Sequence, residues 1–360
     1  MYTLRRLQPL LDGHWYDAVA AVLDAAIRGG VSTPALLKAR QYAVAAKRVL
    51  DLDAEDFGQI AEGFAREHWK HDLSQACFPP EPRQRNRGAL ASLVPLYELM
   101  LEVLDLRAER HEPLQIVVTA HLLGEYLPQL AWETTLGHAG DPLHLASVVG
   151  ERWGTDDPTC PHTSAQRATA RRALNAASGD VAGFTSYLDR FHSRQGSALA
   201  LCAMNHETVE AGERPDVGET CPTPCGWAVR GTIEERRDLD ARVRLALVYQ
   251  GSPIVALRHH APVGHFFGVP STSEISDAWL RTWEKVSQPW PDGSNPLLVG
   301  AAPGRPDPHE ALPGMAALVS AVAGRTIGPG SLIRDIGADI AAAVPRDEAD
   351  LVPLLAGRSA

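Results

Sequence analysis

The sequence predicts a mostly α protein, with a helical N-terminal domain over residues 1–210 and a smaller α+β domain with an antiparallel hairpin over residues 211–360. Apolar residues recur at helical spacing through the first 210 positions, which favours helices there. By contrast, residues 242–247 alternate at period two, the period of a half-buried strand, with larger apolar side chains at every second position. A chain of 360 residues, 45% of them hydrophobic, is long enough for two or three folded domains.

The N-terminal half is expected to be a series of helices. Gly29 and Gly30 end a first helix, and Pro34 is suited to the first turn of the next because its missing N–H has no partner there. Pro95 and Pro128 must each begin or bend a helix. The later helices predicted in this half span residues 54–76, 90–106, 114–136, 164–177 and 181–203.

The C-terminal half is expected to mix strands and helices. Residues 242–247 and 254–257 form a predicted hairpin around the turn Gly251-Ser252, and residues 263–269 are a candidate third strand. Ser271 and Glu274 then form a capping box. The helix that they begin carries an apolar face made of Ile275, Trp279, Trp283 and Val286, and two more helices are expected before the C-terminus.

Composition limits the classes of function. A net charge of −10 disfavours an extended nucleic-acid surface, and no stretch is apolar and long enough for a membrane span or a signal peptide. The chain is therefore expected to be cytoplasmic, with its five cysteines reduced, and its Ala, Arg, Gly and Pro enrichment is typical of a GC-rich bacterial genome. The Gly-rich loops that hold nucleotide phosphates are absent from the sequence.

A zinc site is predicted from two pairs of ligand-type residues. Cys221 and Cys225 lie on one Pro/Gly turn that resembles a zinc-ribbon knuckle, with one residue more than usual between the cysteines. Cys202 and His206, one helical turn apart, complete a predicted tetrahedral set for Zn²⁺. Cys160 and His162 are the alternative second pair, and inert, separate thiols are the competing interpretation.

A second cluster predicts a small-molecule pocket. Arg258, His259, His260 and His265 lie within eight residues, so the guanidinium could hold an anion within reach of the imidazoles. One version of this hypothesis is a thiol hydrolase with Cys225 as nucleophile and His265 as base. Histidines on the surface of a hairpin would explain the same residues without catalysis.

Three pairs in the helical half stand one turn apart, as metal ligands in helical bundles do. A di-metal centre is a weaker hypothesis here, because the usual Glu-x-x-His spacing is absent. Solvated helix faces show the same pairs: His68 with Asp72, Glu98 with Glu102, and His121 with Glu125.

Two functions follow from the sequence. The first is a zinc-binding enzyme of unidentified reaction that acts on a small molecule through the histidine cluster. The second is a zinc-stabilised helical scaffold or protein-binding module without catalysis, alone or as a homo-oligomer.

Overall fold

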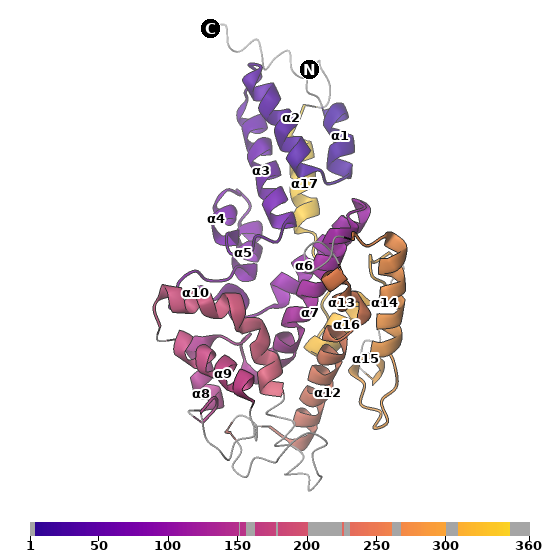
Figure 1. The fold of residues 1–360 in the computed structure, drawn as a ribbon. Coiled ribbons are helices and arrows are strands. Elements are labelled where there is room, and N and C mark those ends of the chain that lie inside the picture. Colours follow the sequence, from indigo (N-terminus) through magenta and orange to yellow (C-terminus); the bar gives the residue numbers. More distant parts are fainter. Residues whose placement is uncertain are drawn as a thin grey trace.

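The computed structural model describes residues 4–150, 152–155, 163–177, 179–200, 225–226, 231–260, 268–299 and 309–345. Within these ranges the chain is helical, and none of the described residues forms a strand (Figure 1). The helices, with two 3₁₀ turns marked η, are α1 (Leu4–Asp12), α2 (Tyr16–Arg28), α3 (Pro34–Leu50), α4 (Phe57–Glu62), α5 (Glu67–Ala76), η1 (Gly88–Leu90), α6 (Val94–Glu109), α7 (Pro113–Leu136), α8 (Pro142–Val149), α9 (Ser164–Ala176), α10 (Val181–Arg190), α12 (Ile233–Gln250), α13 (Pro253–Ala256), η2 (Leu257–His260), α14 (Thr272–Val286), α15 (Pro296–Val299), α16 (Met315–Ala323) and α17 (Leu332–Ala343).

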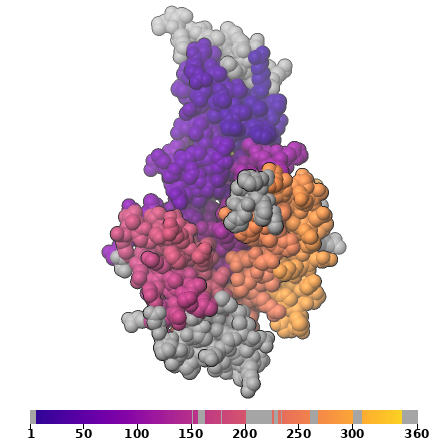
Figure 2. All heavy atoms as spheres, viewed as in Figure 1, coloured from indigo at the N-terminus to yellow at the C-terminus, as the bar shows by residue number. Residues whose placement is uncertain are grey.

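Helices from the two ends of the chain form one bundle. The C-terminal helix α17 packs against α1 and α3, and α2 packs against both α1 and α3. Figure 1 shows these four helices together at one end of the molecule, and in Figure 2 the indigo N-terminal helices are visible at its narrow end. The four-helix bundle is therefore complete only when α17 has packed against the N-terminal helices.

The long helix α7 is the centre of the rest of the molecule. It packs against α6, α12, α13 and α16, and α14 packs on α12 and α13 at the outer side. Helices α8, α9 and α10 form a separate group in Figure 1, on the other side of α7 from α14. No described helix is long and apolar enough to cross a membrane.

The predicted hairpin is wrong, because residues 233–250 form the single helix α12 and residues 253–256 form the short helix α13. Thr232 and Glu235 make a capping box that begins α12. In α12 the buried residues Leu239, Val243 and Ala246 follow helical spacing. The α+β description of the C-terminal half is therefore corrected to all-α over the described residues, while residues 261–267 of the candidate third strand lie outside them.

Several helix predictions are confirmed, with shifted ends. The capping box of Ser271 and Glu274 begins α14, and Pro95 lies in the first turn of α6. The helix predicted over residues 54–76 is instead two, α4 and α5. The domain boundary near residue 210 falls outside the described residues and stays a prediction, although α12 and α17 each pack on helices from the first half of the chain.

Candidate functional site

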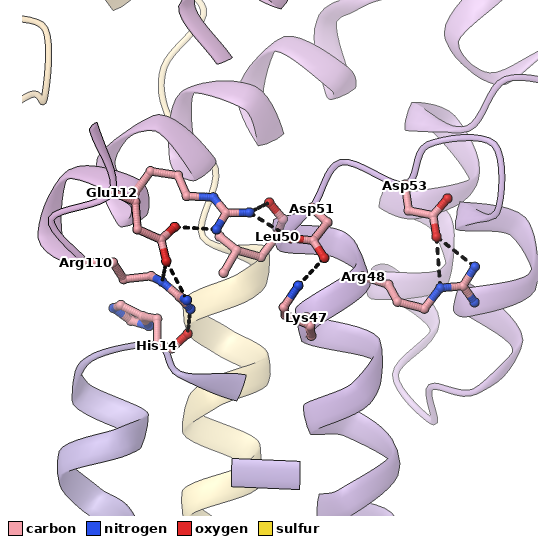
Figure 3. A network of polar contacts seen from close by, with 9 residues as sticks. His14, Lys47, Arg48, Leu50, Asp51, Asp53, Arg110 and Glu112 are labelled. Atoms are coloured by element: carbon pink, nitrogen blue, oxygen red, sulfur yellow. Dashed lines mark hydrogen bonds and ion pairs between the residues drawn. The ribbon is translucent and has the colours of Figure 1, made fainter. Parts of the chain in front are cut away.

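A buried ionic network fixes the turn between α6 and α7 (Figure 3). The guanidinium of Arg107 contacts Glu112 and donates to Asp51 Oδ1 at 2.8 Å and to the carbonyl of Leu50 at 2.9 Å. Arg110 donates to Glu112 Oε1 at 2.8 Å and to the backbone carbonyl of His14. Both arginines are nearly buried, so their charges depend on these partners. The network joins the end of α3, the α1–α2 turn and the α6–α7 turn.

The same turn holds His111 in an uncommon backbone conformation. His111 has φ of +56°, in the left-handed region that non-glycine residues seldom adopt. Hydrogen bonds from His111 N to Ala108 O and from Glu112 N to Arg107 O, both 3.0 Å, keep the turn closed. Pro113 then begins α7. The imidazole of His111 is thereby placed beside the first turn of α7.

An apolar groove lies where this turn meets α14 and the segment 311–313. Its volume is about 460 Å³, and we call it the α14 groove. Its described lining residues are Ala108, His111, Pro113, Ile116, Thr272, Ile275, Ser276, Trp279, Leu280, Trp283, Ala311, Leu312 and Pro313. Polar side chains in this lining come from His111, Thr272 and Ser276, so the surface offered to a ligand is mainly apolar.

Two tryptophans one turn apart on α14 form one wall of the groove. Their ring centroids lie 5.9 Å apart at an interplanar angle of 42°. Trp279 Nε1 donates to the carbonyl of Pro313 at 3.2 Å, which fixes that ring against the opposite segment. Trp283 lies against the backbone of Gly314, where a Cβ atom would stand 2.4 Å from the ring. Leu280, at the rim, is 65% exposed.

A polar cleft of about 720 Å³ lies at the α1–α2 turn and is lined by His14, Tyr16, Glu109 and Arg334. Glu109 accepts from Arg334 Nη2 at 2.6 Å and lies 3.1 Å from His14 Nε2. Burial, followed by the positive charge of Arg334, lowers the pKa of His14. Burial opposes ionisation of Glu109, but the hydrogen bond and charge of Arg334 together with His14 hold its pKa below the usual value. Glu109 and Arg334 therefore compensate each other, which leaves Asp12 as the other acidic residue in the lining of the cleft.

Two residues of the predicted histidine pocket, Arg258 and His259, belong to the described part of the chain. Arg258 and His259 lie in η2, where Arg258 contacts His121 and lies 3.9 Å from Glu125 Oε1. The His121 and His259 rings have centroids 6.4 Å apart. The hydrogen bond from His121 lowers the pKa of Glu125, and Arg258 adds to this shift. The side chain of His260 and the whole of His265 lie outside the described residues, so the catalytic assignment stays a prediction.

The functional prediction of a zinc protein is corrected. Among the described residues, no group of three or more His, Cys, Asp or Glu side chains could hold a metal ion. Cys225 is 1% exposed and belongs to the hydrophobic core. Five of the proposed zinc ligands, including both of the alternative pair, lie outside the described residues: Cys160, His162, Cys202, His206 and Cys221.

The helical pairs that suggested a di-metal centre separate into two places. His68, Asp72, Glu98 and Glu102 line one pocket, while His121 and Glu125 contact Arg258. In the described part of the chain, neither set of residues forms a group of His, Cys, Asp or Glu side chains that could hold a metal ion.

Sequence reasoning identified one wall of the α14 groove and missed the other. The apolar face with Trp279 and Trp283 was predicted from its spacing, without a function assigned to it. The facing wall comes from the α6–α7 turn and from residues 311–313, far away in the sequence. The chain has no match among protein-family models, curated proteins or solved structures. The groove geometry is therefore the basis for a functional proposal.

Proposed function

We propose that this protein binds a small, largely apolar molecule with an aromatic part in the α14 groove. The observation that carries the proposal is the combination of a volume of about 460 Å³ with a mainly apolar lining. Small-molecule sites are typically clefts of about 300–1,000 Å³ with apolar walls and few polar groups. The size and the lining of the groove both meet this description.

The tryptophans support an aromatic ligand. The half-buried ring of Trp283 and the ring of Trp279 form a rigid wall, and aromatic rings pack well against such faces in offset or edge-on contact. His111, Thr272 and Ser276 supply the hydrogen-bonding groups that would orient one polar substituent of the ligand. Because the ionic network fixes the backbone turn that carries His111, this part of the groove wall is formed before the ligand arrives.

Fluorescence titration with N-phenyl-1-naphthylamine, an uncharged aromatic probe, tests this function. Leu280→Asp should weaken binding about tenfold, because it places a charge on the apolar rim, and tenfold corresponds to about 1.4 kcal/mol. Leu37→Asp is the matched control, since Leu37 is 48% exposed on α3 and does not line the groove. Ser276→Trp should block binding by filling the groove.

Equal affinities for the wild type, Leu280→Asp and Ser276→Trp would place the probe elsewhere and contradict the proposal. A loss of binding shared by Leu280→Asp and Leu37→Asp would do the same, because it would reflect a general effect of charge.

A further inference from the structure

A second pocket, separate from the α14 groove, lies between α5, α6 and the beginning of α17. Its volume is about 250 Å³, and we call it the acidic pocket. Four carboxyl groups line it, from Asp72, Glu98, Glu102 and Asp335. Among its described lining residues there is no lysine or arginine, and its basic side chains are those of His68 and His71. The lining therefore favours a positively charged ligand.

Glu102 differs from the other three carboxyl groups because it is buried, with 1% of the residue exposed. Its Oε1 accepts backbone hydrogen bonds from Ile333 N at 2.9 Å and Arg334 N at 3.0 Å, in the first turn of α17. Its Oε2 is also buried and has no hydrogen-bond partner within the described part of the chain. A buried polar atom without a partner is costly, so such an atom in a pocket wall is a candidate ligand contact.

The unpartnered oxygen faces the pocket wall at Gly330. A Cβ atom on Gly330 would lie 3.5 Å from Glu102 Oε2, and Gly330 itself lines the acidic pocket. Glu98 stands one turn before Glu102 on α6. Burial raises the pKa of Glu98, the positive charge of Arg325 nearby opposes this rise, and the negative charge of Asp72 adds to it. A hydrogen-bond donor that enters the acidic pocket would meet Glu102 Oε2 as an acceptor at the base and the carboxyl groups of Glu98 and Asp72 at the rim.

We infer that the acidic pocket binds a small organic cation, whose ammonium group donates a hydrogen bond to Glu102 Oε2 while Glu98 and Asp72 balance its charge. An ammonium group supplies both the donor that Oε2 lacks and the charge that the rim favours. A metal ion fits less well, since no group of three or more His, Cys, Asp or Glu side chains among the described residues could hold one. The volume of about 250 Å³ limits the ligand to a short amine.

Saturation-transfer NMR with n-butylammonium chloride at low ionic strength tests this inference. The wild type should bind the amine saturably and should not bind n-butanol, which has the same chain without the charge. Burial raises the pKa of Glu102 to about 7, so binding is measured at pH 8, where this carboxyl group is mainly ionised. At that pH Glu102→Gln should weaken binding at least about tenfold, because it removes the charge of the buried acceptor. Glu98→Gln, at an exposed position, should weaken binding of the amine about threefold. This second variant still tests the inference if Glu102→Gln does not fold.

Glu62→Gln is the matched control, because Glu62 is an exposed acid on α4 that does not line the pocket. Equal binding of n-butanol, an unchanged affinity in both Glu98→Gln and Glu102→Gln, or no saturable binding by the wild type would overturn the inference. Displacement of the amine by stoichiometric Mg²⁺ or Ca²⁺ would overturn it in favour of a metal site. None of these results depends on the α14 groove.

Discussion

Single backbone positions set the shape of the α14 groove. Gly314 has φ of +94° and lies against the ring of Trp283, so it meets two requirements that only glycine meets well. His111, with φ of +56°, adopts a similar left-handed conformation without being glycine. Its strain persists because Arg107 and Arg110 hold the turn from both sides.

Gly314→Ala should destabilise the protein by about 1–3 kcal/mol and weaken probe binding in the groove, since the new Cβ would strain the backbone and displace Trp283. Urea denaturation and the fluorescence titration measure the two effects. Gly328→Ala is the control, because no described atom other than its chain neighbours lies within 4 Å of a Cβ built there. Equal stability of the two variants would show that the contact with Trp283 is not tight.

Arg107 and Arg48 differ in burial, with 6% and 35% of their side chains exposed, which allows a matched comparison. Arg107→Met should cost about 1–3 kcal/mol, because it removes the buried donor to Leu50 O, while Glu112 keeps Arg110 as a partner. Arg48→Met should cost less than about 1 kcal/mol, since Arg48 is 35% exposed and its pairs with Asp53 and Asp56 are near the surface. Urea denaturation should separate them, and similar costs would contradict the role given to the network.

At the scale of elements, α12 shows that a helix-capping motif can predict secondary structure better than a short strand-like alternation. The alternation at residues 242–247 resembles a strand because Arg242 stands between apolar residues. In the structure Arg242 is itself buried and donates to the carbonyl of Ala131 on α7 at 3.0 Å. A buried arginine on the apolar face fits the helical period, and only the neighbouring helix reveals its partner. The capping box of Thr232 and Glu235 was the available sequence signal for a helix.

Thr232→Ala should therefore lower the free energy of unfolding by about 1 kcal/mol, because the N–H of Glu235 loses its hydrogen bond to the threonine hydroxyl. Thr232→Ser should restore most of this stability, since it keeps the hydroxyl oxygen. Thermal denaturation followed by circular dichroism measures both. If Thr232→Ala had the same thermal stability as the wild type, the Thr232 cap would not stabilise the beginning of α12.

At the scale of the whole molecule, buried histidines should make the fold sensitive to acid. Burial lowers the pKa of His192 and of His138 to about 4, from an ordinary value of 6.5. His192 Nε2 donates to Ala139 O at 2.8 Å, and its Nδ1 is buried without a partner in the described part of the chain. Both rings are therefore neutral in the folded protein at neutral pH.

Because the unfolded chain binds these protons more readily, stability is full above pH 6.5 and is lost as the pH falls towards 4. The loss should reach about 3 kcal/mol for His192. Glu102 acts in the opposite direction, since burial raises its pKa to about 7 and its protonation favours the fold. Urea denaturation at pH 7 and pH 4.5 gives the loss of stability on acidification for His192→Asn and for the wild type. Because both proteins contain Glu102, its contribution cancels in the difference between the two losses. The variant should lose less stability on acidification, whereas exposed His71→Asn should behave as wild type.

The sequence alone determined most of the helices and the apolar face of α14, because capping residues and helical spacing act within a few residues of each other. It did not determine the class of the C-terminal half, since the partner of Arg242 lies on α7, more than a hundred residues away. The tertiary structure also decided the candidate sites. Both the α14 groove and the acidic pocket join residues that are far apart in the chain, as Glu102 and Ile333 are. Their geometry depends on packing between helices, which no local pattern specifies.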